Sequence, residues 1–169
     1  MKIRNATVED AAGILEIYTP YVETTSISFE EIVPTETEMA GRIQGYLASH
    51  AYLVAEDGEG IVGFAYGSTY RPRQAYRFTA EVSVYVADRA KGQGRASQLY
   101  KALLADLTQK GFHSYIAFIT LPNDASERLH KKFGFTHIGT TPQVGRKFGK
   151  WHDIAIWQKT PPSPLRDAN

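Results

Sequence analysis

The stretch "VYVADRAKGQGRASQLYKALL", residues 84–104, decides the fold, because two glycines in it join a strand pattern to a helix pattern. Apolar and polar residues alternate over residues 79–87, which predicts a strand, and apolar residues then recur at helical spacing from about Gly94 to Lys110. Glycine supplies the positive φ angles that such a turn needs. The helix start presents unpaired N–H groups at the positive end of the helix dipole, so the stretch predicts a site for an anion.

The spacing of the glycines indicates which kind of anion the site would bind. Residues 89–94 read R-x-x-G-x-G, whereas a dinucleotide fingerprint would need a third glycine where Ser97 stands, and no P-loop motif is present. A plain strand-to-helix turn is the alternative interpretation. Because Arg89, Lys91 and Arg95 surround the glycines with positive charge, we favour a pyrophosphate.

Composition excludes several classes of protein. The 169 residues suffice for one domain with a real core, and 19 Lys and Arg against 18 Asp and Glu give no basic excess for nucleic-acid binding. Without cysteine there is no disulfide, and the histidines form no metal-ligand pattern, so we expect no metal. No stretch approaches the ~20 apolar residues that cross a bilayer. We therefore expect a cytoplasmic protein that binds neither nucleic acid nor membrane.

Alternating patterns predict a mixed α+β fold in one domain, residues 1–160, followed by a Pro-rich tail, residues 161–169, that we expect to be disordered. Thr7 with Asp10 and Thr35 with Glu38 resemble capping boxes that open the first two helices. The remaining expected elements are strands at 2–6, 51–56, 60–70, 79–87, 113–121, 135–143 and 150–159 and helices at about 94–110 and 123–134.

Several motifs in order resemble a known family. Residues 84–104 look like the acyl-CoA-binding motif, (Q/R)-x-x-G-x-(G/A), of the GCN5-related N-acetyltransferase (GNAT) superfamily, and "LPNDASERLHKKFGF", residues 121–135, looks like its second CoA segment. "NAT-x-x-D", "AY-x-x-TAE-x-x-VYV", "LPND" and "G-x-x-FGKWHDIAIWQ" are similar to hallmarks of the phosphinothricin N-acetyltransferase family. The resemblance runs over nearly the whole chain.

The resemblance implies a GNAT fold: a mixed, mostly antiparallel central sheet flanked by helices, with one splayed strand pair. The strands at 82–86 and 114–121 would diverge, and the pantetheine arm of acetyl-CoA, the co-substrate, would fill the gap like a further strand. Unpaired backbone groups in such a gap need a partner. The residues that would bind acetyl-CoA are Val84, Tyr85, Val86, Arg89, Lys91, Gly92, Gln93, Gly94, Arg95, Ala96 and Asn123. For Asn123, a helix N-cap explains the residue equally well.

The same resemblance implies acetyl transfer to an amine and assigns two catalytic residues. The acceptor ammonium must lose a proton before it attacks, and Glu81 matches the family's general base. His130 matches the position of the acid that protonates the leaving thiolate, and the N–H of Val84 would stabilise the developing oxyanion. The alternatives are a solvated strand glutamate and a structural histidine.

The loop "YRPRQAYRF", residues 70–78, predicts the acceptor. The guanidinium groups of Arg71 and Arg73 suit carboxylate and phosphinate oxygens, and Tyr76 and Phe29 would wall the pocket. By resemblance, the acceptor is a small acidic amino acid or analogue, of the phosphinothricin or methionine sulfone/sulfoximine type, acetylation of which confers antibiotic or herbicide resistance. An exposed basic loop is the alternative. Protein N-termini, lysine or polyamines as acceptors, or a catalytically dead acyl-CoA-binding module, stay open.

The resemblance finally implies a homodimer whose active sites lie near the interface. Trp151 and Trp157, on the last strand, are candidate contact residues, and burial in the core would explain them equally well. His152 is more consistent with a structural or substrate-lining role than with catalysis.

Overall fold

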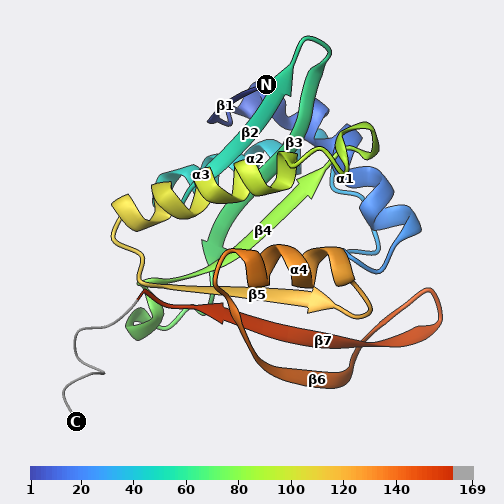
Figure 1. The fold of residues 1–169 in the computed structure, drawn as a ribbon. Coiled ribbons are helices and arrows are strands. Elements are labelled where there is room, and N and C mark those ends of the chain that lie inside the picture. Colours follow the sequence, from blue (N-terminus) through green and yellow to red (C-terminus); the bar gives the residue numbers. More distant parts are fainter. Residues whose placement is uncertain (162–169) are drawn as a thin grey trace.

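The computed structural model describes residues 1–161, which form a seven-stranded sheet covered by helices on both faces (Figure 1). The sheet order is β1-β2-β3-β4-β5-β7-β6, and every neighbouring pair is antiparallel except β4 with β5. The predicted mixed, mostly antiparallel sheet is therefore confirmed. The strands are β1 (Lys2–Asn5), β2 (Tyr52–Asp57), β3 (Gly60–Thr69), β4 (Thr79–Val86), β5 (Ser114–Thr120), β6 (Thr136–Lys147) and β7 (Lys150–Lys159).

The helices begin and end close to the positions that the caps predict. Thr35 accepts a hydrogen bond from the N–H of Glu38 at 3.2 Å, and its own N–H donates to the Glu38 carboxylate at 2.7 Å. Gly111, with φ of 90°, follows the end of α3. The helices are α1 (Ala11–Thr24), α2 (Glu36–Ser49), α3 (Arg95–Gln109) and α4 (Asp124–Lys132), with 3₁₀ turns η1 (Val8–Asp10), η2 (Gln74–Tyr76) and η3 (Asp88–Ala90).

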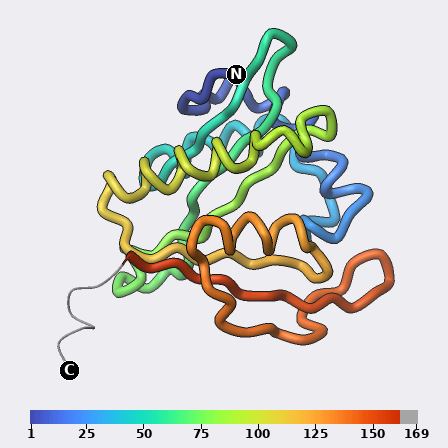
Figure 2. The backbone as a smooth tube through the Cα atoms, viewed as in Figure 1, coloured from blue at the N-terminus to red at the C-terminus, as the bar shows by residue number. Residues whose placement is uncertain are grey.

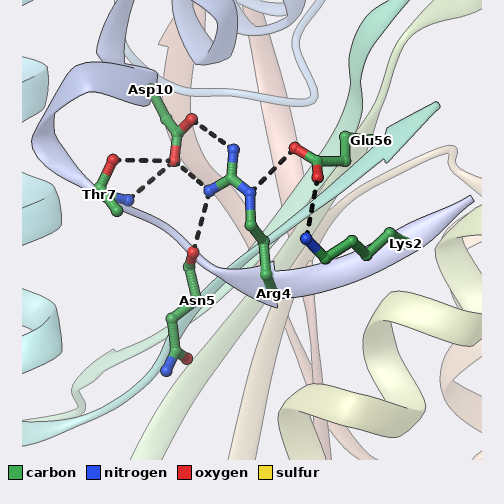
Figure 3. Close-up of polar contacts among 6 residues, drawn as sticks. All are labelled: Lys2, Arg4, Asn5, Thr7, Asp10 and Glu56. Carbon is green, nitrogen blue, oxygen red and sulfur yellow. Dashed lines mark hydrogen bonds and ion pairs between the residues drawn. The ribbon is translucent and has the colours of Figure 1, made fainter. Parts of the chain in front are cut away.

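The first capping box is part of a larger ionic network, which Figure 3 shows. Arg4 of β1 donates to both oxygens of Asp10, at 2.7 and 2.8 Å, and through Nε to Glu56 of β2 at 2.9 Å. The Asp10 carboxylate also accepts the N–H of Thr7 at 2.8 Å. These bonds hold the pKa of the buried Asp10 below its usual value. The network fixes the chain entry into η1 and α1 against the sheet.

The alternation along β4 assigns its side chains to two cores, as predicted. Val82 packs with Leu99 and Leu103 of α3 on one face. Tyr85 points to the other face, where its ring meets that of Tyr18 of α1 at 5.1 Å. The face of β4 that carries Glu81 is therefore the face covered by α1 and α2.

The β6–β7 hairpin is longer than the sequence predicts. We expect a strand ending at residue 143, but β6 continues to Lys147, which pairs with Lys150 of β7. Phe148 and Gly149 lie between them with φ of 50° and 73°, the positive values that a tight hairpin turn requires. The tip of this hairpin lies beside the connector between α1 and α2 (Figure 2), where Lys147 bonds the carbonyl of Ser28.

Three further expectations from the sequence concern the two tryptophans, the C-terminal tail and membrane-spanning helices. Trp157 is 8% exposed and belongs to the core, whereas Trp151 is 60% exposed. Beyond Pro161, the Pro-rich tail lies outside the described residues. Within residues 1–161, none of the helices has the length and apolar character required to span a bilayer.

Candidate active site

The candidate site begins where β4 and β5 part. The two strands pair at Thr79↔Ser114, Ala80↔Tyr115 and Glu81↔Ile116, and the pairing stops there although both strands continue. The V-shaped opening between them is visible in Figure 1. The predicted splayed pair is therefore present.

The backbone groups of β4 face this gap. The N–H of Ala87 donates to the carbonyl of Val62 in β3 at 2.9 Å, in register with the β3–β4 ladder. Because backbone groups alternate sides along a strand, those of Val84 and Val86 point away from β3 and into the gap. The hydroxyl of Tyr21 donates to the Val86 carbonyl at 2.7 Å.

The β5 side of the gap also presents backbone groups to it. The N–H of Leu121 donates to the carbonyl of Asp153 in β7 at 2.9 Å, in register with the β5–β7 ladder. The backbone groups of Phe118 and Thr120 consequently face the gap from the β5 side. A ligand with its own amide groups would satisfy both strand edges.

At the wide end of the gap lies the glycine turn for which the sequence predicts an anion site. Gly92 and Gly94 both have φ of 74°, and Gly94 is the N-cap of α3. A cavity of about 390 Å³ is lined here by residues of the glycine turn and the first turn of α3, including Lys91 and Ala96. Among residues 1–161 the buried Nε of Arg95 has no hydrogen-bond partner. An orphaned cationic donor beside free helix N–H groups fits the pyrophosphate of acetyl-CoA.

Two of the residues predicted to hold the cofactor have side chains engaged elsewhere. Arg89 pairs with Asp57 at 3.1 Å and Glu59 at 3.2 Å in the β2–β3 hairpin. Gln93 donates through Nε2 to the carbonyl of Arg89 at 2.8 Å. The cavity lining includes neither residue. Their contact with acetyl-CoA stays a prediction.

Asn123 is the N-cap of α4, one of the two interpretations that the sequence left open, and its contact with acetyl-CoA stays a prediction. Its Oδ1 accepts the N–H of Ser126 at 3.2 Å, as an N-cap of α4 does. Asn123 also lines the gap between β4 and β5 and the cavity near the glycines. Capping therefore fixes Asn123 at a position that borders both the gap and the cavity near the glycines.

Glu81 lies at the closed end of the gap and lines a cleft of about 400 Å³ on the α1–α2 face of the sheet. Phe29, Tyr66 and Phe118 line the same cleft. Burial raises the pKa of the Glu81 carboxyl, because the charged form loses hydration. A half-buried carboxylate with a raised pKa can accept a proton from an acceptor ammonium.

His130 of α4 borders the gap from the other side and is only 4% exposed. Its Nδ1 lies 2.7 Å from the carbonyl of Ser126, so Nδ1 carries the proton and donates. Nε2 is buried and has no partner within the described part of the chain. Burial lowers the pKa of His130, so the ring is neutral at pH 7 with Nε2 free to accept a proton.

The predicted acceptor residues divide into two groups. Phe29 lines the Glu81 cleft, as predicted. Arg71 and Arg73 are exposed, and the Arg71 guanidinium lies over the rings of Tyr70, at 5.2 Å, and Tyr76, at 5.9 Å. The loop reaches the cleft through Tyr70, whose ring stacks on Phe118 at 6.3 Å. The structure brings the loop to the cleft, but not the two arginines into its lining.

Two residues that line the site escaped the sequence analysis. Tyr21 bonds Val86, lines the anion cavity and carries Lys91 over its ring at 5.2 Å. The helical spacing of Ile14, Ile17 and Tyr21 could have indicated it. Ile27 borders the gap, the anion cavity and the Glu81 cleft, and nothing in its local sequence marks it.

No cluster of three or more His, Asp or Glu residues suited to a metal ion occurs within residues 1–161.

Comparisons with known proteins agree with this geometry. Residues 3–156 match a family model described as an Acetyltransferase (GNAT) domain. The chain is 37% identical to a phosphinothricin N-acetyltransferase of Streptomyces viridochromogenes, over 98% of this chain and 93% of the relative. It is 39% identical to an L-methionine sulfoximine/L-methionine sulfone acetyltransferase of Pseudomonas aeruginosa, over 92% of each. A phosphinothricin acetyltransferase from Sinorhizobium meliloti, solved with AcCoA, superposes with a TM-score of 0.90 at 36% identity, covering 94% of this chain and 87% of that one.

The anion site generates a first prediction. Gly94→Val places a β-branched side chain at φ of 74° on the first N–H groups of α3. No atom lies within 4 Å of a Cβ there, so the effect falls on the backbone conformation and on ligand approach. We expect the dissociation constant for acetyl-CoA to rise at least ~10-fold, about 1.4 kcal/mol, measured by calorimetry.

Gly111→Val is the matched control. Gly111 has φ of 90° and equally open surroundings, but it lies at the other end of α3. The Gly111→Val protein should be less stable than the wild type but should bind acetyl-CoA with unchanged affinity. Unchanged affinity in a folded Gly94→Val protein would refute the assignment.

Proposed function

The chain belongs to the GNAT acetyltransferase family, and from this premise we propose how its residues transfer an acetyl group from acetyl-CoA to the amino group of a small acidic amino acid. It is an acetyl-CoA-dependent N-acetyltransferase of the phosphinothricin acetyltransferase family. The observation that carries the mechanism is the position of Glu81, at the last paired residue before β4 and β5 diverge. We propose that residues 1–160 act as one acetyltransferase domain.

In this proposal, backbone groups hold the co-substrate. Val84 and Val86 bond the pantetheine amides from one edge of the gap, and the N–H groups from Gly92 to Ala96 bond the pyrophosphate. The unpartnered Nε of Arg95 supplies a further donor. Acetyl-CoA supplies the activated acetyl thioester. The Val84 N–H, which faces the gap, is the donor for the oxygen that becomes negative during transfer.

Glu81 is the proposed general base. It accepts a proton from the acceptor ammonium, directly or through a water molecule, and frees the amine for attack. Its raised pKa makes it a stronger base than an exposed glutamate. Since a group with a raised pKa stays protonated up to a higher pH, activity should fall on acidification through a value above the usual glutamate range.

His130 has a proposed role at the leaving group. An ammonium carries three protons and an amide nitrogen keeps one, so two must leave the nitrogen. Glu81 takes the first before attack. The free Nε2 of His130 accepts the second proton from the acceptor nitrogen and then donates it to the departing thiolate sulfur. His130 therefore acts first as a base and then as an acid. This order fits a ring that burial keeps neutral.

The acceptor class rests on the relatives and on the loop beside the cleft. The relatives act, by their names, on phosphinothricin and on methionine sulfoximine or sulfone. We propose that Arg73 or Arg71 binds the second acidic group of such an acceptor. Antibiotic or herbicide resistance would follow from that activity. Protein N-termini, lysine and polyamines are the competing acceptors, and a dead binding module is the competing function.

We also propose a homodimer that works in the cytoplasm. The support is the exposed outer hairpin: Phe148 and Trp151 are 56% and 60% exposed, and Ile138 and Val144 on β6 are 54% and 52% exposed. Apolar side chains gathered on one edge are typical of a contact surface.

Sedimentation velocity tests the assembly. We expect a dimer, and Trp151→Lys should shift the equilibrium toward monomer because it buries a charge in the interface. A wild-type monomer that is independent of concentration would reject the proposal.

The base assignment predicts a pH-dependent loss. Glu81→Gln keeps the size of the side chain but cannot accept a proton, so kcat should fall by ~10²–10⁴ while the affinity for acetyl-CoA is kept. The deficit should shrink as pH rises, because more amine then arrives already neutral. Steady-state kinetics from pH 6 to 9 measure it.

Glu23→Gln, on the exposed end of α1, serves as control and should leave the rate unchanged. A folded Glu81→Gln protein with wild-type turnover across this range would show that the base lies elsewhere.

An acceptor panel tests substrate class and the arginine together. Release of free thiol is followed with phosphinothricin, methionine sulfoximine, neutral amino acids, an alanine-terminated peptide, lysine and spermidine. Arg73→Ala should lower kcat/KM for acidic acceptors by an amount equivalent to ~2–4 kcal/mol and leave neutral acceptors and acetyl-CoA affinity unchanged.

Arg77→Ala, in the same loop with its guanidinium over Phe78, is the matched control. Equal losses for neutral and acidic acceptors would show that the loop is merely basic. Tight binding of acetyl-CoA without turnover of any acceptor would favour the binding module.

A further inference from the structure

The connector between α1 and α2 forms one wall of the acceptor cleft, yet it has no regular structure of its own. Residues 25–35 contain no helix or strand, and Ile27, Ser28 and Phe29 from this connector line the cleft around Glu81. A wall without internal hydrogen-bond ladders needs an external support to hold a fixed shape.

A buried lysine from the β6–β7 hairpin reaches this connector. Lys147 is 3% exposed, and its ammonium donates to the carbonyl of Val22 at 2.6 Å and of Ser28 at 2.7 Å. Val22 lies in the last turn of α1, where the helix dipole favours a cation. Two carbonyls on either side of the bend in the chain are thus held by one group, and burial of the charge is offset by these bonds.

Gly145, two residues before Lys147, leaves room for the ring of Phe29. A Cβ at Gly145 would lie 2.8 Å from Cδ2 and Cζ of Phe29 and closer still to Cε2. The φ of Gly145 is outside the left-handed region, so the glycine is needed for space and not for its backbone conformation. The ring of His152, across the hairpin from Gly145, lies 6.1 Å from that of Phe29.

We propose that Lys147 and Gly145 of the β6–β7 hairpin are positioning residues that hold Phe29 against the acceptor cleft. Lys147 fixes the path of the connector, and Gly145 receives the ring. This inference rests on the proposed acetyltransferase function and concerns the same cleft. With the Phe29 ring held in this position, the cleft is narrow and favours small amino-acid acceptors over bulkier ones. Releasing the ring should therefore raise KM for small acceptors and weaken discrimination between acceptors of different size.

The first test removes and restores the ammonium. The chain has no cysteine, so Lys147→Cys introduces the only thiol. The unfolded variant is alkylated with 2-bromoethylamine, which rebuilds a lysine-like ammonium, or with iodoacetamide, which adds a neutral amide, and is then refolded. We expect the Lys147→Cys and amide forms to raise KM for a small acidic acceptor ~10–100-fold and to change acetyl-CoA affinity by less than ~3-fold, and the aminoethyl form to recover most of the loss.

Equal activity of the aminoethyl and amide forms, or equal losses for acceptor and acetyl-CoA, would overturn the role of Lys147. If the alkylated forms do not refold, Lys147→Met, expressed directly, gives the same KM comparison without alkylation.

The second test concerns the space that Gly145 leaves for the Phe29 ring. Gly145→Ala should raise acceptor KM ~10-fold, whereas Gly139→Ala, on the same strand with no atom within 4 Å of its Cβ, should change it less than ~2-fold. In a Phe29→Ala background the collision is gone, so Gly145→Ala should add less than a ~2-fold effect. Additive losses in the double variant would show that Gly145 does not act through Phe29.

A measurement without turnover separates this inference from the proposed function. Amide hydrogen exchange of residues 22–30 should speed up in Lys147→Cys and slow again in the aminoethyl form. If exchange follows this pattern while the wild type acetylates no amine, the proposed function fails and the positioning role stands. If the wild type is active and exchange is unchanged, the positioning role fails alone.

Discussion

The short parallel ladder between β4 and β5 is the constraint on which the rest of the structure depends. Only three residue pairs join the strands, ending at Glu81↔Ile116. Beyond them the facing edges of the two strands have no strand partner, although the Tyr21 hydroxyl bonds the Val86 carbonyl, and unpaired backbone groups inside a protein cost free energy. The surrounding elements hold the strands apart: α3 packs on β4, and β7 pairs with β5 from Tyr115 to Thr120. The opening is therefore built into the sheet, and the chemical groups of the site are arranged around it.

Position along the opening decides what each residue can do. At the wide end, β4 leads into the glycine turn and the N-terminus of α3, the proposed position of the pyrophosphate, because free N–H groups at a helix start stabilise an anion. At the closed end, Glu81 lies where the strands meet and where little water reaches it, so burial raises its pKa. The distance between these ends suits a long ligand whose charged part and reactive part are well separated.

Local signals predicted the fold well, since caps, glycines and alternation act over a few residues. The boundaries of α2, α3 and β4 follow from them. Long-range contacts were not readable in the same way. The diversion of Arg89 to Asp57 depends on a hairpin more than thirty residues away. Likewise, Lys147 contacts Val22, 125 residues earlier in the chain, from a strand that the sequence predicts to end at residue 143.

Burial acts in opposite directions on the two groups proposed for proton transfer, and this brings their proton affinities together. It raises the pKa of the Glu81 carboxyl and lowers that of the His130 imidazole, because in each case the charged form is the one that loses hydration. An exposed glutamate would be too weak a base for an ammonium, and an exposed histidine would hold its proton too firmly to start as an acceptor at slightly acid pH. Glu81 lines the cleft at the closed end of this gap, and His130 borders the gap from α4. The same splayed strand pair that creates the binding site therefore tunes the two residues that flank it, and neither adjustment requires a charged neighbour.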